Sequence, residues 1–250
     1  MMKRHEVSPL VLQKVLWLPV RIILITFGRM EIHGLENLKS IRSNVIFAAN
    51  HSSELDPILL PAALPFWSRF SPMYYAHREI SFYNRRGFRR VIYRHMFFKL
   101  WGGHQIKTGC KDYRASLANH LKLLQEGKSL FFFPEGDKTR DGARLPTRGG
   151  IGYLLQHGNR PVVPVAITGT FQTTASQCFT RKRKIIMSIG HPIYPSDALA
   201  AVAADAGKCA NIYKAQAEYV MTAVEHLLNK ITNGSVDAAP ESLASSSEVV

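Results

Sequence analysis

The chain reads VIFAA (45–49) and continues directly into NHSSELDP (50–57), so an apolar run ends on a histidine and an aspartate follows five residues later. A short apolar run bounded by polar residues predicts a buried strand. Asp before Pro, followed by the apolar ILLPAAL (58–64), predicts the start of a helix. A strand that passes through a short turn into a helix is the repeating unit of α/β folds, in which sites gather where strands end.

The same alternation continues along the chain. We expect an α/β fold with a mixed, largely parallel sheet flanked by helices. The expected domains are a membrane-interface segment at 1–29, one globular domain at 30–232 and a disordered tail at 233–250. Apolar runs predict strands at 44–49, 71–76, 104–107, 129–133, 162–168 and 184–190, and helical patterns fall at 57–64, 82–99, 111–126, 149–158 and 208–231.

The charge balance points to an anionic partner. The chain has 250 residues with 32 Lys and Arg against 18 Asp and Glu, a formal net charge of +14. The last 17 residues hold three of these acids and no Lys or Arg, so residues 1–233 carry +17. Such a surface attracts nucleic acid, anionic lipid or an acidic carrier. The cysteines, whose spacing predicts neither a disulfide nor a metal site, are Cys110, Cys178 and Cys209.

The apolar N-terminal stretch at 7–28 predicts contact with a membrane. It lacks the cleavage site of a secretory signal, and Lys14, Pro19 and Arg21 interrupt it as a spanning helix. An amphipathic or re-entrant segment in the membrane interface fits better, and a packed core helix is the alternative. The Arg-rich segment 82–99 has an apolar stripe beside a basic one, which is typical of an interfacial helix on anionic lipid. Without a recognisable nucleic-acid motif, we expect no nucleic-acid partner.

The spacing of His51 and Asp56 suggests a catalytic pair. On one helix they would lie about 140° apart, but a turn between them would bring them together. The carboxylate would then orient the imidazole as a general base for a hydroxyl group. The plain alternatives are a helix cap for Asp56 and a strand-end histidine for His51.

A second strand end also carries unusual chemistry. SLFFF (129–133) leads into PEGDKTRDGARLPTRGG (134–150), a glycine-rich turn with Glu135, Lys138, Arg140 and Arg148. Such a turn could cradle a phosphate group, or it could be a solvated basic loop.

Four ordered blocks give the chain a family resemblance. NHSSELDP, FFFPEGDKTRDG (131–142), VVPVAITG (162–169) and IGHPI (189–193) resemble the blocks of the glycerolipid acyltransferases typified by 1-acylglycerol-3-phosphate acyltransferase, the PlsC-like family. The resemblance runs from about residue 30 to about residue 230. It implies acyl transfer from a thioester, carried by coenzyme A or an acyl carrier protein, to the hydroxyl group of a lysolipid.

The resemblance also assigns roles to residues. His51 would be the base and Asp56 its orienting partner. Glu135 and Gly136 would help to form the acceptor site, with Lys138, Arg140, Arg148 and Lys107 near the acceptor phosphate. No metal and no further cofactor are implied. The expected location is the cytoplasmic face of a membrane rich in anionic lipid, with phosphatidic acid as the product.

The sequence departs from the family pattern in two places. Asp137-Lys138 stands where Thr-Arg is usual, and Lys107 stands near the place of a usual arginine. Lysine lacks the bidentate fork of arginine, so another lysolipid, such as a lyso-ornithine lipid, or glycerol 3-phosphate stays open as the acceptor. A hydrolase would need a nucleophile, but the chain has no G-x-S-x-G motif. A basic membrane- or nucleic-acid-binding protein without activity is the non-enzymatic alternative.

Overall fold

The computed structural model describes residues 4–77, 99–107, 112–173, 184–204 and 211–234. The described residues form one seven-stranded sheet in the order β1-β7-β6-β2-β5-β3-β4. Neighbouring strands run parallel except β6 and β7, so the sheet is mixed and mostly parallel, as predicted. The strands are β1 (Glu31–His33), β2 (Ile46–Ala49), β3 (Met73–His77), β4 (Gly103–Gln105), β5 (Ser129–Phe132), β6 (Val162–Thr168) and β7 (Ile186–Ile189).

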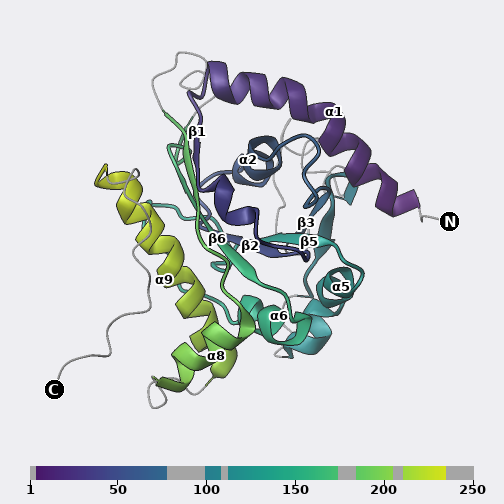
Figure 1. The fold of residues 1–250 in the computed structure, drawn as a ribbon, viewed down its shortest axis with the longest axis vertical. Helices are drawn as coiled ribbons and strands as arrows, with labels where there is room; N and C mark the ends of the chain where they lie inside the picture. Colours follow the sequence, from purple (N-terminus) through teal and green to yellow (C-terminus); the bar gives the residue numbers. More distant parts are fainter. Residues whose placement is uncertain (1–3, 78–98, 108–111, 174–183, 205–210, 235–250) are drawn as a thin grey trace.

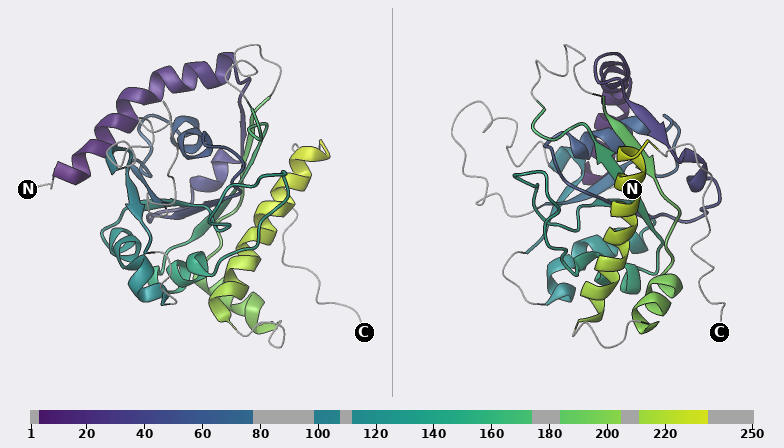
Figure 2. Two further views of the ribbon diagram at one scale, coloured as in Figure 1. Left: turned by 180° about the vertical axis from the view of Figure 1, so that it is seen from behind. Right: turned by 90° about the vertical axis from the view of Figure 1, so that its left-hand side faces the viewer.

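Helices cover both faces of the sheet. Figure 1 and Figure 2 show α1 and α2 over one face, and α5, α6, α8 and α9 over the other. The helices are α1 (Arg4–Thr26), α2 (Asp56–Ala63), α5 (Tyr113–Gln125), α6 (Gly150–Gly158), α8 (Pro195–Ala204) and α9 (Ile212–Thr232), with a 3-10 turn η1 at Leu35–Leu38.

Strand β2 lies at the centre of this three-layer arrangement. Its register places Phe47 beside Phe131 of β5 and Val163 of β6, and every residue of β2 is buried. Phe47 belongs to the core beneath α1 and α2, whereas its neighbour Ile46 belongs to the core beneath α5, α6 and α9. Burial on both faces explains the unbroken apolar run that precedes residue 50.

Strand β3, which follows β2 in the chain, lies on one side of β2 in the sheet. Strand β6, which follows β5 in the chain, lies on the other side of β2, so the direction of strand addition changes at β2. The turn that contains His51 therefore leaves the sheet at its centre. The carboxyl ends of β2, β5 and β6 meet at one edge of the sheet, which is where α/β proteins bind ligands.

Three elements were not predicted, one of which is the 3-10 turn η1. Strand β1 has three residues at the sheet edge, too few for a pattern to report. Helix α8 reads PSDALAAVAA, whose alanines favour a helix without an apolar periodicity. The predicted helix 82–99 lies outside the described residues except for Lys99, and the predicted tail lies outside them from residue 235.

Polar side chains fix helix α1 to the domain. Buried Gln13 donates through Nε2 to the carbonyl oxygens of Met73 and Trp101 at 2.8 and 2.9 Å, and its Oε1 accepts the Met73 amide. Trp17 and Arg21 donate to carbonyl oxygens at the end of α2, at 2.9 Å for Trp17 and at 2.7 and 2.9 Å for Arg21. A cation at the end of a helix is also favoured by the helix dipole.

The opposite side of α1 is an exposed apolar stripe. By length and composition alone, Val7–Thr26 is the one helix of the described residues that is long and apolar enough to cross a membrane. Its interrupting residues Lys14 and Arg21 contact the domain, since Lys14 lies over the ring of Phe66 and Arg21 bonds to α2. We define the apolar stripe as Val7, Val11, Val15, Leu18, Ile22 and Ile25, all exposed.

Candidate active site

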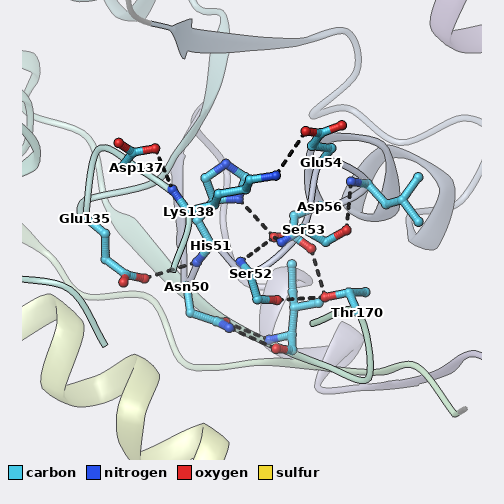
Figure 3. Close-up of polar contacts among 12 residues, drawn as sticks. Asn50, His51, Ser52, Ser53, Glu54, Asp56, Glu135, Asp137, Lys138 and Thr170 are labelled. Carbon is cyan, nitrogen blue, oxygen red and sulfur yellow. Dashed lines mark hydrogen bonds and ion pairs between the residues drawn. The ribbon is translucent and has the colours of Figure 1, made fainter. Parts of the chain in front are cut away.

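His51 and Asp56 meet across the turn that follows β2, as Figure 3 shows. Nδ1 of His51 lies 2.9 Å from Oδ2 of Asp56, so the turn brings the two side chains together as the spacing predicted. The imidazole stacks on the ring of Phe133, with centroids 4.1 Å apart. With Nδ1 engaged, Nε2 is the nitrogen that can exchange a proton with a bound molecule.

The Asp56 carboxylate is fully buried and acts as a hydrogen-bond acceptor. Its Oδ2 accepts the backbone N–H groups of Ser52 and Ser53 at 2.8 and 2.7 Å. An ionised carboxylate only accepts hydrogen bonds, so the hydrogen between His51 and Asp56 is carried by Nδ1 of His51. The interpretation of Asp56 as a helix cap is wrong. Its side chain turns back to the preceding amides, and Leu55 occupies the cap position without a side-chain bond.

The backbone of His51 is held from both sides. Glu135 Oε1 accepts its N–H at 3.1 Å, and its carbonyl oxygen accepts the Thr139 N–H at 2.9 Å. The other oxygen of Glu135 accepts the amide of Leu145 at 2.8 Å, and Glu135 is buried. Glu135 therefore links the histidine to the loop 134–148, which we call the acceptor loop after the role that the family resemblance implies for it.

The other candidate residues of the PEGDKTR block lie on this loop. Gly136 has a φ of +70°, and a Cβ atom there would lie 2.8 Å from Cδ of Arg148, so the position suits only glycine. Lys138 Nζ donates to Glu54 at 3.0 Å, which joins the acceptor loop to the turn after His51. Arg140 and Arg148 are exposed. Three basic side chains thus lie on the loop whose residues Glu135 and Thr139 bond the backbone of His51.

Two further contacts shape the acceptor loop. Hydrogen bonds from the Ala143 amide and the Thr139 hydroxyl hold the pKa of Asp141 below its ordinary value. Arg144 forms ion pairs with two glutamates of α9 and donates to Thr147. The loop is therefore tied to helix α9 as well as to His51.

Lys107 stands apart from this group. It is exposed and follows β4, the edge strand, three positions from β2 in the sheet. At about 4.8 Å for each strand, that separation is about 14 Å. The structure brings Lys138, Arg140 and Arg148 onto the loop that holds His51, and it leaves Lys107 at the edge.

Two functional candidates escaped prediction. The Asn50 side chain exchanges a pair of 2.9 Å hydrogen bonds with the backbone of Ile167, which extends the pairing of β2 and β6. Thr170 donates through Oγ1 to Asp56 Oδ1 at 3.0 Å. Only the position of each residue at the end of a predicted strand was a signal.

The arrangement can remove a proton from a hydroxyl group, with basic side chains close by to hold an anion. Among the described residues no group of three or more His, Cys, Asp and Glu side chains is placed to hold a metal ion.

Comparisons with known proteins identify the family of the chain. The family model described as Acyltransferase matches residues 29–168. A chloroplastic 1-acyl-sn-glycerol-3-phosphate acyltransferase of Brassica napus is 27% identical over 188 residues, which cover 73% of this chain and 50% of that protein. The enzyme of that name from Bacillus subtilis is 26% identical over 71% of this chain and 80% of its own length.

A solved structure has a similar fold. The crystal structure of the 1-acyl-sn-glycerophosphate (LPA) acyltransferase PlsC from Thermotoga maritima gives a TM-score of 0.60 at 17% identity, over 96% of this chain and 86% of that one. The chain spans about half the length of the plant relatives it matches.

Proposed function

The chain belongs to the Acyltransferase family, and from that premise we propose that it transfers a fatty acyl group from a thioester to the hydroxyl group of a lysophospholipid. The proposed acceptor is 1-acylglycerol 3-phosphate, and the product is phosphatidic acid. The observation that carries this proposal is the 2.9 Å hydrogen bond between His51 Nδ1 and the buried carboxylate of Asp56. Relatives named 1-acyl-sn-glycerol-3-phosphate acyltransferase support the choice of acceptor.

In the proposed reaction, His51 Nε2 takes the proton of the acceptor hydroxyl while its oxygen attacks the thioester carbonyl carbon. The tetrahedral intermediate then collapses and the carbon–sulfur bond breaks. The leaving thiolate takes from His51 the proton that came from the acceptor hydroxyl. Asp56 keeps Nδ1 protonated and stabilises the imidazolium. No acyl-enzyme and no cofactor are required, and the donor is acyl-CoA or an acyl carrier protein.

The acceptor phosphate is assigned to the acceptor loop. Its basic residues Lys138, Arg140 and Arg148 supply positive charge, and Glu135 and Gly136 set the course of the loop. Lys107 is the remaining candidate, from the far edge of the sheet. Asp137-Lys138 in place of Thr-Arg keeps a second acceptor, another lysolipid or glycerol 3-phosphate, as the competing possibility.

We also propose that the protein works at the cytoplasmic face of a membrane. The apolar stripe of α1 is exposed while the polar residues of the helix bind the domain. Trp67 is 86% exposed in the loop after α2 and lies beside Lys14 and Phe66. An exposed tryptophan next to a basic side chain is typical of a membrane interface. The net charge of +14 suits anionic lipid.

The test is thioester consumption by the full chain in mixed micelles, measured against lysophosphatidic acid, other lysolipids and glycerol 3-phosphate. We expect turnover with lysophosphatidic acid, the highest kcat/KM for it, and a kcat lower by on the order of 100- to 10,000-fold in the His51→Ala variant. Preference for glycerol 3-phosphate or for any other lysolipid would overturn the proposed acceptor, and absence of transfer to every acceptor would overturn the proposed activity.

A further inference from the structure

We propose that Thr170 is a positioning residue that holds the buried carboxylate of Asp56 in the orientation His51 requires. Thr170 lies beyond the end of β6, and it contacts the catalytic pair through a side chain 114 positions away from Asp56 in sequence. This inference rests on the proposed function, because the pair must act as the base for Thr170 to affect the rate.

Hydrogen-bond accounting singles out the Thr170 hydroxyl. Oδ2 of Asp56 receives three donors: His51 Nδ1 and the amides of Ser52 and Ser53. Within the described parts of the chain, Oδ1 has one donor, the Thr170 hydroxyl at 3.0 Å. Asp56 is fully buried, so its Oδ1 is out of reach of bulk water. A buried carboxylate oxygen without a donor is costly, so the Thr170 hydrogen bond stabilises this orientation of the carboxylate.

The direction of the hydroxyl hydrogen follows from its neighbours. Thr170 Oγ1 also lies 2.8 Å from Ser52 Oγ. A hydroxyl group has one hydrogen, and a carboxylate oxygen only accepts. Thr170 therefore donates to Asp56 and accepts from Ser52, which gives a chain from Ser52 through Thr170 to Asp56. Successive hydrogen bonds of this kind strengthen one another.

The local fold is built to deliver this hydroxyl. Gly169 has a φ of +82°, and a Cβ atom at that position would lie 2.0 Å from the Lys184 carbonyl oxygen, so only glycine turns the chain here. Immediately before this turn, the backbone of Ile167 is hydrogen-bonded to the side chain of Asn50, the residue that precedes His51. Thr170 itself is 1% exposed. Its branched Cβ restricts its χ1 rotation, which keeps the hydroxyl on Asp56.

The test compares Thr170→Val, which keeps the shape and removes the hydroxyl, with Thr170→Ser, which keeps the hydroxyl. We expect Thr170→Val to lower kcat tenfold to about a hundredfold, the value of one hydrogen bond to a charged group, with acceptor and donor KM within twofold. Thr170→Ser should restore kcat to within about threefold. Thr173→Val is the matched control, because its hydroxyl donates to the Gly169 carbonyl in the same turn and should leave kcat within twofold.

A second readout does not depend on turnover. In full-length protein labelled with ¹⁵N-histidine, the Nδ1–H resonance of His51 is identified by its absence in His51→Ala. We expect this resonance to shift upfield or exchange faster with water in Thr170→Val, and to return in Thr170→Ser. If Thr170→Val does not fold, Thr170→Ala takes its place in both measurements.

Three outcomes would overturn the proposal: an unchanged Nδ1–H resonance in folded Thr170→Val, a kcat within twofold of wild type, or a serine variant as slow as the valine variant. A wild-type protein that transfers no acyl group would refute the proposed function instead, and the resonance would still test the contact between Thr170 and Asp56.

Discussion

The buried carboxylate of Glu135 accepts the backbone N–H of His51 at 3.1 Å, so the loop after β5 supports the turn after β2. Its other oxygen accepts the Leu145 amide of the acceptor loop. A charged side chain that bonds two backbone amides fixes both segments relative to each other. Glu135 thus couples the position of the base to the loop that we assign to the acceptor.

Glu135→Gln should damage both segments. In the variant, the side-chain NH₂ group of glutamine faces one of the two backbone N–H groups that the carboxylate accepted. That hydrogen bond is lost, and the buried N–H group is left without an acceptor. We expect the free energy of unfolding to fall by about 1–3 kcal/mol and the acceptor kcat/KM to fall at least tenfold, with the donor KM within twofold. Urea unfolding and initial rates measure the two effects. Asp137→Asn on the same loop is the control, since its Oδ1 accepts the amide of the adjacent Lys138 and the amide oxygen of asparagine can keep that bond. An unchanged kcat/KM would contradict this coupling.

His51→Ala and Asp56→Asn should separate the two members of the pair. Loss of the base lowers kcat by on the order of 100- to 10,000-fold. In Asp56→Asn the amide oxygen accepts from His51, Ser52 and Ser53, and the amide nitrogen donates to Thr170, whose hydroxyl rotates. The fold should therefore persist while the neutral amide stabilises the imidazolium less, and kcat should fall by less than in His51→Ala. Substantial turnover by folded His51→Ala would refute the mechanism.

Arg140→Ala should weaken binding of the acceptor phosphate. Arg140 is exposed on the acceptor loop, and we expect its loss to raise the acceptor KM about tenfold while the donor KM stays within twofold. Lys107→Ala, just after the edge strand β4, which lies about 14 Å from β2, should raise the acceptor KM less. Neither change should affect an acceptor without phosphate, such as a monoacylglycerol. A rise in the donor KM alone would assign the loop to the donor phosphates.

The sequence predicted best where burial is complete. Strands β2, β5 and β6 are apolar except for the terminal residues Ser129 and Thr168, because helices cover both faces of the sheet. Strand β1 escaped because a three-residue edge strand has no pattern, and α8 because its alanines carry no periodicity. Element boundaries are the predicted ones for β6 and elsewhere differ by at most four residues, as element ends commonly do.

The candidate site was predictable only within one segment. The His51–Asp56 contact spans five residues, so a turn between them suffices to infer it. Thr170 reaches Asp56 across 114 residues, and the Glu135–His51 bond spans 84, and neither contact leaves a local pattern. The helix-cap alternative for Asp56 does not hold, because its carboxylate accepts the amides of Ser52 and Ser53, which precede it.

Membrane binding should depend on the outward face of α1. We expect Ile22→Ser, on the apolar stripe, to weaken binding to vesicles about tenfold or more, since burying one such side chain contributes about 1.5–3 kcal/mol. Leu199→Ser on α8 is the matched control, because Leu199 is 47% exposed against 50% for Ile22 but lies on the opposite layer. Co-sedimentation with vesicles of mixed neutral and anionic lipid measures the binding.

The salt dependence should separate the apolar contribution from the charged one. Burial of apolar surface responds little to salt, whereas attraction to anionic lipid is screened within about 10 Å at 0.1 M salt. We expect full-length protein to stay bound at high salt and a variant lacking residues 1–28 to bind anionic vesicles only at low salt. An equal loss of vesicle binding in Ile22→Ser and Leu199→Ser would mean that α1 does not face the lipid.

A buried histidine should govern stability in mild acid. His120 on α5 is 0% exposed; its Nε2 contacts the His104 carbonyl at 3.2 Å, and its Nδ1 has no hydrogen-bond partner among the described residues. Burial, with a smaller contribution from His104, lowers the pKa of His120 to about 4. The pKa of His104 is also lowered, chiefly because this side chain is buried.

The sign of the pH effect follows from which state takes up the proton. Between about pH 6.5 and pH 4 the unfolded chain protonates residue 120 and the folded chain does not, so stability falls as pH falls through this window. The loss attributable to His120 is about 3 kcal/mol when pH reaches 4. His120→Gln removes the titrating group, so its free energy of unfolding in urea should depend less steeply on pH from 6.5 to 4. His226→Gln, at an exposed position on α9, should keep the wild-type slope. Equal slopes for His120→Gln and wild type would show that His120 titrates alike in the folded and unfolded states, and the acid sensitivity would then belong to His104 or to carboxylates.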